Sequence, residues 1–498
     1  MIENSFAISF TFIAYLVVML SVGLWAYKRT TSSEDYFLGG RSLGPWPAAL
    51  SAGASDMSGW LLLGLPGYAY ASGMESIWLA GGLLVGTWLN WLICAKRLRT
   101  YSIVANNSLT IPAYLAQRFE DKSKLLQSIS AVFILLFFLF YTSSGLVAGG
   151  KLFETVFGFD YTTAVIIGTV CVVSYTLFGG FLAVSWTDLI QGLLMVAALM
   201  IVPIVALEGS LSDLGQTLSA KNPELLNIWS DVKGEPLSAI AIISLVAWGL
   251  GYFGQPHILA RFEATRSNGD IKSARRIAVS WTALSMTGAL LIGFVGIAYV
   301  DTHLGGSIKD GETIFMLLVN AVFHPVIAGI LLAAILAAIM STADSQLLVS
   351  SSALAEDFYK QVFRPQATQE EIVKVGRIAV IALSIVALML AMNPESTVLG
   401  LVSYAWAGFG AAFGPAILLS LFWKGMNRNG ALAGVVIGGV TVVVWKQLTG
   451  GIFDLYEIVP GFIFASIAII AVSKFTGGPA ASVLKTHEEY ESKLISLD

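Results

Sequence analysis

Residues 51–60 (SAGASDMSGW) place an acid and several small polar residues inside an apolar run, residues 43–72, that is long enough to cross a bilayer. Gly, Ser and Asp tend to bond their own backbone, so the run is predicted to be a broken helix. Asp56 would cost about 2.5–3.5 kcal/mol at the centre of a membrane and therefore needs a partner or a function. We interpret the break as a source of backbone and side-chain oxygens that hold a small cation and the polar part of a substrate. The alternative is a kinked helix that packs through small residues, with Asp56 bonded to a neighbouring backbone.

Two hydroxyl residues later in the chain could supply further cation ligands. Ala338, Ser341 and Thr342 stand at positions i, i+3 and i+4, which share one face of a helix. Hydroxyls are hard oxygen ligands of the kind that small cations prefer, and with carbonyls from the broken helix they would complete a site for Na+. A Ser–Thr pair in a membrane helix more often bonds its own helix. The cation interpretation therefore depends on pairing with the break at residues 54–58.

Aromatic residues mark a second glycine-rich stretch, residues 247–257 (AWGLGYFGQPH). Trp248, Tyr252 and Pro256 recur every four residues and predict one wall of a pocket for an apolar ring, although an aromatic stripe is more often plain packing. Tyr141, in another apolar run, could add a phenol to the same cavity.

Asp188 follows the sequence GGFLAVSWT and is a second acid at membrane depth. It would lie on an ion exit path, or it would cap the N-terminus of its helix. The sequence leaves both interpretations open.

The composition indicates that a polytopic membrane protein holds these residues. Of 498 residues, 56% are hydrophobic and only 12% are charged, against about 25% charged in a soluble globule. We expect one all-α membrane domain over residues 1–475 and a short polar cytoplasmic tail over residues 476–498. About thirteen transmembrane helices are expected, over residues 6–27, 43–72, 76–95, 125–150, 161–178, 186–207, 236–257, 277–300, 314–343, 376–392, 398–423, 430–449 and 457–473.

Basic residues are distributed unevenly between the expected loops. With the N-terminus outside, the inner segments hold 23 of the 28 Lys and Arg residues, and the outer segments hold four. Positive charge collects on the cytoplasmic side, so we expect the N-terminus outside and the C-terminus inside. The basic residues of the inner segments include Arg261, which is expected in the loop after the seventh span.

The two glycine-rich breaks fall in the second and seventh expected spans, five spans apart. An odd spacing indicates an inverted five-plus-five repeat over about residues 43–423, since direct repeats of whole hairpins would have even spacing. Coincidence is the alternative, because glycine is common in membrane helices.

Neither an enzyme nor a nucleic-acid-binding protein is favoured. The four histidines are scattered, and the sequence has no phosphate-binding GxxxxGK motif and no basic patch that alternates with aromatic residues. No cofactor is expected besides a co-transported ion. A cation channel is the rival class, but it would need a continuous polar pore or repeated filter loops, whereas the polar residues here gather at two breaks.

Six motifs resemble those of the sodium:solute symporter family, over about residues 30–475. They are DYFLGGRSLGPW (35–46), SAGASDMSGWLLLGLPG (51–67), FGGFLAVSWTD (178–188), WGLGYFGQPHILARF (248–262), ILAAIMST (335–342) and GLVSYAWAGFGAAFGP (400–415). Such a set is far more specific than any single motif. The resemblance implies a leucine-transporter-type fold, in which ten core helices form inverted halves between one leading and two trailing helices.

The resemblance also implies roles for individual residues. The implied Na+ ligands are the carbonyls of Ala54, Met57 and Ala338 and the hydroxyls of Ser341 and Thr342. The implied substrate region comprises Ser58, Gly59, Tyr141, Trp248, Tyr252 and Pro256. Asp56 and Asp188 match acids tied to sodium binding or passage, and Arg41 matches a residue associated with coupling, whereas Asp344, expected at the inner mouth, has no assignment.

The activity that the resemblance implies is Na+-coupled uptake of L-proline into a bacterium. The protein would lie in the lipid of the cytoplasmic membrane. Relatives carry sugars, vitamins and other small solutes, so another solute is the alternative within the family. The sequence leaves open whether Li+ or H+ replaces Na+, and which oligomer forms.

Overall fold

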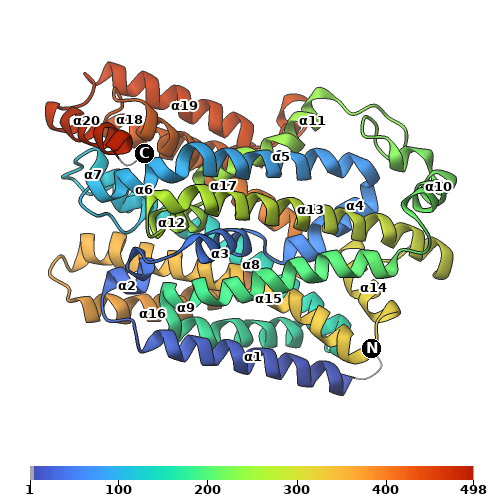
Figure 1. The fold of residues 1–498 in the computed structure, drawn as a ribbon. Helices are drawn as coiled ribbons and strands as arrows, with labels where there is room; N and C mark the ends of the chain where they lie inside the picture. Colours follow the sequence, from blue (N-terminus) through green and yellow to red (C-terminus); the bar gives the residue numbers. More distant parts are fainter. Residues whose placement is uncertain (1–4, 497–498) are drawn as a thin grey trace.

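The computed structural model describes residues 5–496, which fold into a bundle of helices that run mostly along one direction (Figure 1). The two ends of the chain lie at opposite ends of this bundle. The described residues form no β-strand, and two isolated bridges join extended segments. The α-helices are α1 (Ser5–Tyr27), α2 (Ser33–Leu38), α3 (Pro45–Asp56), α4 (Leu65–Ser72), α5 (Ser76–Leu89), α6 (Ala95–Val104), α7 (Ile111–Arg118), α8 (Leu125–Phe157), α9 (Tyr161–Ala206), α10 (Leu211–Lys221), α11 (Ala239–Val246), α12 (Pro256–Glu263), α13 (Asn268–His303), α14 (Ile314–Val322), α15 (Pro325–Ser352), α16 (Gln369–Ala391), α17 (Val398–Phe422), α18 (Arg428–Trp445), α19 (Ile458–Phe475) and α20 (Ala481–Ser496).

Ten helical segments of the described chain are long and apolar enough to cross a membrane, or eleven if the bent pair Ala239–Gly254 and Pro256–Glu263 counts as one span. The chain is therefore an all-helical, multi-pass membrane protein. One of the ten segments, Trp60–Val104, has 45 residues, and a straight helix of that length would measure about 68 Å, more than twice the hydrocarbon thickness. It turns at Gly73, whose φ of +66° favours glycine. The count of thirteen spans stays a prediction.

The prediction of a single span over residues 314–343 is wrong. Two helices cover it, because α14 ends at Val322 and α15 begins at Pro325. Proline suits the first position of a helix, where its missing N–H is not needed and its fixed φ is already helical. After Ser352 the chain continues as a π-helix, η8 (Ala353–Phe363). Within this largely apolar run, Pro325 is the sequence signal that marks the break.

Both predicted breaks are present. α3 ends at Asp56, and Met57 leaves the helical region with φ −79° and ψ 78° before a π-helical turn, η2 (Trp60–Gly64), leads into α4. The second break is a 3-10 helix, η6 (Ala247–Gly254), followed by the extended residue Gln255. The two halves of this second segment meet at 46°.

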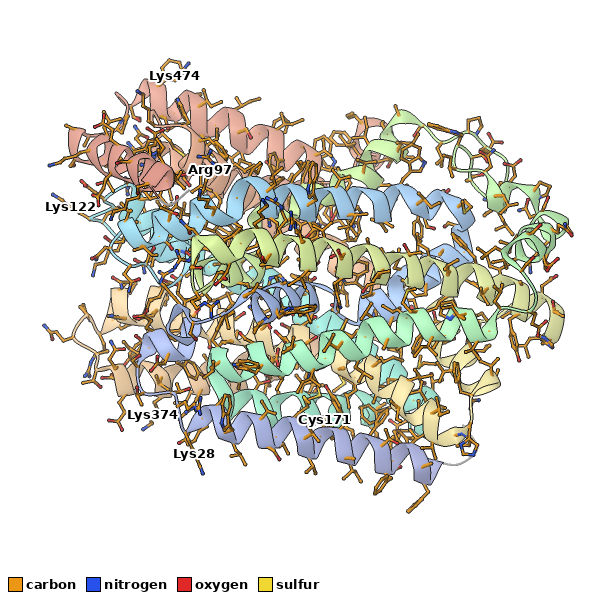
Figure 2. All side chains as sticks on the ribbon, in the orientation of Figure 1. Lys28, Arg97, Lys122, Cys171, Lys374 and Lys474 are labelled. Atoms are coloured by element: carbon orange, nitrogen blue, oxygen red, sulfur yellow. The ribbon has the colours of Figure 1, made fainter. Side chains whose placement is uncertain are left out.

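The broken segments lie inside the bundle, and other helices surround them. α3 packs against α9, α13 and α15, and η6 packs against α17 and α5. α1 lies along one edge of the bundle, and α18 to α20 lie at another (Figure 1). Lys28, Lys122, Lys374 and Lys474 all lie toward the end of the bundle where the chain ends (Figure 2).

The polar tail predicted over residues 476–498 contains a helix in its described part. This helix, α20, packs against α6, and the ring of Tyr490 stacks on that of Tyr101 with centroids 4.1 Å apart. His487 is also buried at this contact. The tail is therefore docked on the bundle along α20.

Candidate functional site

The carbonyl of Ala54, in the last turn of α3, faces α15. The hydroxyls of Ser341 and Thr342 donate hydrogen bonds to it at 2.8 and 3.1 Å. The Ser341 hydroxyl also lies 3.1 Å from the carbonyl oxygen of Ala338. The structure thus brings together four of the five residues predicted as Na+ ligands, and the fifth, Met57, is the first residue after α3. Such a buried group of uncharged oxygens suits a small hard cation.

Asp56 connects the first break to two residues of the predicted substrate region. Its Oδ2 accepts a hydrogen bond from the Tyr252 hydroxyl at 2.8 Å, and its backbone carbonyl accepts one from the Tyr141 hydroxyl at 2.9 Å. The side-chain Oδ1 is buried and has no hydrogen-bond partner among the described residues. The alternative that Asp56 bonds a neighbouring backbone group is therefore wrong, since its side chain bonds a phenol from the second break.

Trp248, Tyr252 and Pro256 do not form the single wall that their spacing predicted. The prediction assumed an α-helix, but Ala247–Gly254 is a 3-10 helix with three residues per turn, so residues four apart point in different directions. Trp248 stacks on Tyr456, with ring centroids 5.4 Å apart, and lines a cavity of about 700 Å³. Pro256 lines a separate cavity of about 20 Å³. Tyr252, midway between them in the chain, bonds the first break.

Ser58 and Gly59 lie in the first break, and both are buried. The Ser58 hydroxyl accepts a hydrogen bond from the backbone N–H of Trp60 at 3.3 Å. A Cβ on Gly59 would lie 2.6 Å from the Cβ of Ala148 on α8, so a larger residue would force the two helices apart. Close packing therefore accounts for Gly59, as the structural alternative for this stretch proposed.

The wide cavity lies toward the end of the bundle where the chain begins. Residues of α4, η6 and α17 line it together with the loops before α14 and α19. At its border Lys151 forms ion pairs with Asp310 at 3.0 Å and with Glu312 at 2.7 Å. Glu312 also accepts a hydrogen bond from the backbone N–H of Val398, at the start of α17, at 3.3 Å. These contacts tie α8, α17 and the loop before α14 together.

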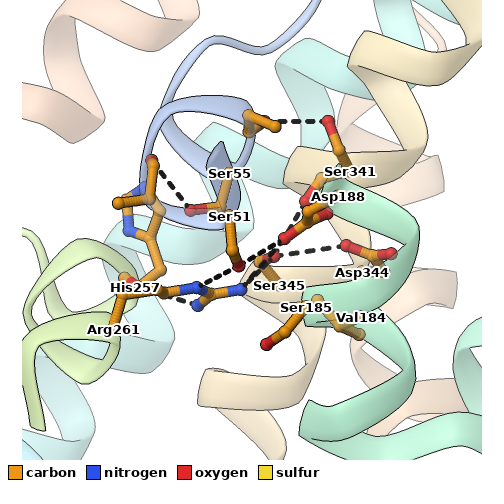
Figure 3. Close-up of polar contacts among 12 residues, drawn as sticks. Ser51, Ser55, Val184, Ser185, Asp188, His257, Arg261, Ser341, Asp344 and Ser345 are labelled. Atoms are coloured by element: carbon orange, nitrogen blue, oxygen red, sulfur yellow. Dashed lines mark hydrogen bonds and ion pairs between the residues drawn. The ribbon is translucent and has the colours of Figure 1, made fainter. Parts of the chain in front are cut away.

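Asp188 belongs to a buried charge network (Figure 3). It lies eight residues after the kink at Gly180, inside α9, so the capping interpretation is wrong. Its Oδ2 accepts a hydrogen bond from the Ser51 hydroxyl at 2.7 Å and pairs with Nη2 of Arg261 at 3.4 Å. Arg261 also donates to the hydroxyls of Ser51 at 2.9 Å and Ser345 at 2.7 Å. The network therefore joins α3, α9, α12 and α15.

The sequence placed Arg261 in an inner loop, and this assignment is wrong. Both Arg261 and Asp188 are fully buried. A buried pair offsets its desolvation only while both partners are present, so the two residues depend on each other. The signal that could have located Arg261 is its position inside the amphipathic segment Pro256–Glu263, which follows the second break directly.

The sequence assigned no function to two further buried residues near the network of Asp188 and Arg261. Asp344 is not at an inner mouth, because it is fully buried on α15, with Oδ1 3.3 Å from the Ser345 hydroxyl. The ring of His257 packs against those of Phe138 and Tyr141 and finds no hydrogen-bond partner within residues 5–496. Neither position could be assigned from the sequence, since helix packing decides what each side chain meets.

Arg41 lies apart from the cation and substrate groups. Its guanidinium donates to the Asn107 side chain at 3.0 Å and to the backbone carbonyls of Ser108 and Glu263 at 2.7 and 2.8 Å. Partial burial lowers the pKa of this guanidinium. Arg41 therefore ties the α2–α3 connection to the α6–α7 loop and to the end of α12, and its association with coupling stays a prediction.

The model of the sodium:solute symporter family matches residues 36–438 of this chain. The chain belongs to this family. Membership makes it a transport protein rather than an enzyme and implies Na+ as the co-transported ion.

Named relatives and a solved structure are similar to this symporter over nearly its whole length. The "High-affinity proline transporter PutP" of Bacillus subtilis (strain 168) is 53% identical over 479 residues, which cover 96% of this chain and 100% of the relative. The "Sodium/proline symporter" of Escherichia coli (strain K12) is 52% identical over 487 residues, which cover 97% and 96%. A solved Na+-coupled sialic acid symporter, in a substrate-bound outward-open state, aligns with a TM-score of 0.79 at 22% identity, covering 95% of this symporter and 99% of that chain. The last likeness shows the fold alone.

Proposed function

We propose that this symporter couples inward Na+ movement to the uptake of L-proline by alternating access. Relatives that are 52–53% identical are named proline transporters. The structural observation that carries the proposal is the contact of the Ala54 carbonyl with the hydroxyls of Ser341 and Thr342 across the broken helix. Transport of another small solute by the same mechanism is the alternative.

The proposed Na+ site consists of the carbonyls of Ala54, Met57 and Ala338 and the hydroxyls of Ser341 and Thr342. The short distances between these groups support it, since a small rotation of the two hydroxyls would direct their lone pairs at an ion. Asp188 and Asp344, both fully buried, are proposed to assist ion passage rather than to bind the ion in this site.

The proposed proline site lies between the two breaks. Proline carries an ammonium group, a carboxylate and an apolar ring. The free Oδ1 of Asp56 can accept a hydrogen bond from the ammonium, and the phenols of Tyr141 and Tyr252 lie next to it. Trp248, at the base of the wide cavity, offers an apolar face to the ring.

Coupling follows from the closeness of the two proposed sites along the chain. Ala54 and Asp56 are two residues apart, so an ion that fixes the end of α3 against α15 also fixes the carboxylate at the substrate site. Bound Na+ would thereby favour the state that is competent for substrate, which is a difference in affinity between states. One Na+ gains about 2.3 kcal/mol per 100 mV, which corresponds to roughly 40-fold accumulation at about 1.4 kcal/mol per tenfold.

We propose thirteen spans in a bacterial cytoplasmic membrane, with the N-terminus outside, the C-terminus inside and an inverted five-plus-five repeat. The positions of the termini and of four labelled lysines support this orientation (Figures 1 and 2). The wide cavity then opens at the outer end of the bundle, and the small cavity lies at the inner end. Labelling of a tag at each terminus in intact cells, with a membrane-impermeant reagent, tests the orientation.

Uptake of radiolabelled proline into proteoliposomes, with and without an inward Na+ gradient, tests the activity. We expect accumulation above equilibrium only with the gradient. Accumulation of a different solute, with no proline uptake, would assign another substrate. Ion flux that proceeds without solute uptake would instead favour a channel.

A further inference from the structure

Two cavities at the inner end of the symporter are separated by a thin partition. The small cavity, of about 20 Å³, reaches Pro256 at the second break. The other has a volume of about 200 Å³ and is lined mainly by polar residues of the α6–α7 loop, α8 and η8. Leu109, Thr110 and Asp357 line both cavities. These three residues therefore stand between the proposed substrate site and the inner end.

Asp357 is the centre of this partition. Its Oδ1 accepts a hydrogen bond from the Thr110 hydroxyl at 2.7 Å and another from Nε2 of Gln127 at 2.8 Å. The carboxylate is fully buried, and Oδ2 has no hydrogen-bond partner in the described part of the chain. Thr110 caps the N-terminus of α7, Gln127 lies in the first turn of α8, and Asp357 lies in η8, so one carboxyl group connects three elements.

The arrangement is a poor means of stabilising the fold. A buried carboxylate with a free oxygen carries a desolvation cost that an apolar side chain of similar size would avoid. Hydrogen bonds to a carboxylate are strong but directional, so they close a gap firmly in one geometry and are lost in another. π-Helices are rare and occur frequently at functional sites, and η8 turns Asp357 toward the cavity that Ser352 also lines.

The size of the small cavity sets a requirement on transport. A space of about 20 Å³ accommodates about one water molecule, so proline cannot pass until the partition opens. Asp357 lies on η8, which continues α15 without interruption, and α15 carries Ser341 and Thr342. A shift of α15 that accompanies loss of the ion would therefore move Asp357 relative to Thr110 and Gln127.

We propose that Asp357, held by Thr110 and Gln127, is the inner gate of this symporter. The proposal rests on the proposed function. In the closed state both hydrogen bonds are made, and solute leaves toward the inner end only after they break. Asp357 does not bind the solute in its site. Its hydrogen bonds hold the route to the inner end closed.

A cysteine at Ser352 reports on the gate, since Ser352 lines the small cavity behind the partition. The reporter chain carries Ser352→Cys with Cys94→Ala and Cys171→Ala, which removes both native thiols. Na+-driven proline uptake by this chain is measured first, so that failure of the proposed function is recognised separately. The labelling rate with a membrane-impermeant maleimide is then measured in inside-out vesicles, in Na+ without proline.

Asp357→Asn and Gln127→Met should each increase the labelling rate about tenfold, because each weakens or removes one of the bonds that favour the closed state. The double variant should label no faster than about the faster single variant, since both changes act on one group. Thr110→Ser keeps the hydroxyl and should label like the parent. Thr169→Val is the matched control, because among the described residues this buried hydroxyl bonds the Val165 carbonyl of its own helix, at 2.8 Å.

Unchanged labelling in both Asp357→Asn and Gln127→Met would overturn the proposal, as would equal acceleration by Thr169→Val. A lower melting temperature without faster labelling would assign Asp357 a structural role and also overturn it. If Asp357→Asn does not reach the membrane, Gln127→Met decides alone, since it leaves the carboxylate in place.

Discussion

The two ends of the proposed transport path are closed to very different degrees. At the outer end a cavity of about 700 Å³ reaches down to Trp248, whereas the small cavity behind the inner partition measures about 20 Å³ and stops at Asp357. The charged groups at the two ends also differ in how deeply they are buried. The outer end is bordered by Lys151 and its partners, of which Glu312 is 11% and Asp310 is 42% exposed, while the inner half contains the fully buried pair of Asp188 and Arg261. The tight barrier is thus built from buried directional contacts rather than from apolar packing alone.

This difference predicts how sensitive each end of the transport path is to substitution. At the outer end Asp310 is partly exposed and screened by water, so the loss of this one partner of Lys151 has a modest cost. A fully buried pair has no such screening, and loss of one partner leaves a charge in an apolar environment. The inner half should therefore respond to charge removal much more strongly than the outer end.

The largest effect is expected for Arg261→Met, which leaves Asp188 buried and unpaired. We expect a loss of about 3–5 kcal/mol in the free energy of unfolding, measured by thermal unfolding in detergent. Asp310→Asn at the outer end should cost clearly less, because Asp310 is 42% exposed and Lys151 keeps its ion pair with Glu312. Arg261→Met combined with Asp188→Asn should recover most of the loss. Equal losses for Arg261→Met and Asp310→Asn would refute the contrast between the two ends.

Between the two ends lies the proposed ion site. Ser341→Ala together with Thr342→Ala should raise the Na+ concentration for half-maximal proline uptake about tenfold or more, because two oxygen ligands are lost. The amount of protein in the membrane should change little. Ser384→Ala is the control, since this buried hydroxyl bonds the Val380 carbonyl within α16. Sodium dependence that stays the same would place the ion site elsewhere.

At the base of the outer cavity, Trp248→Ala should weaken proline binding about tenfold through loss of aromatic contact area. Na+ binding without proline should remain close to that of the unchanged protein, as measured by isothermal titration of each ligand. Trp248→Phe keeps most of the apolar face and should lose less. A parallel loss of Na+ and proline binding would show that Trp248 supports the structure of both sites.

The smallest effect concerns His487 on α20, at the inner end. Burial and the nearby Arg118 lower its pKa from 6.5 to about 4. The unfolded chain therefore takes up the proton first as the pH falls, and stability that is present above pH 6.5 is lost toward pH 4. By pH 5 we expect a loss of about 1–2 kcal/mol, visible as a lower melting temperature. His487→Gln, which cannot titrate, should not show this part of the pH dependence; an identical pH profile would contradict the assignment.

The sequence predicted the helical membrane fold, both breaks and the residues that meet at the Ala54 carbonyl. These features depend on local composition and on helical spacing, which a sequence displays directly. Arg261, Asp344 and Asp357 could not be placed, because their environment depends on how distant helices pack. The predicted aromatic wall at Trp248 was wrong for a related reason, since a change from α to 3-10 geometry alters which residues share a face.

The depth of the outer cavity has an electrical consequence. If water and ions fill it down to Trp248, the insulating part of the protein begins there and, while the inner partition is closed, ends at Asp357, which lines the polar cavity of about 200 Å³. The transmembrane voltage then falls across less than the full hydrocarbon thickness, so the field on an ion between the two breaks is stronger than in a plain bilayer.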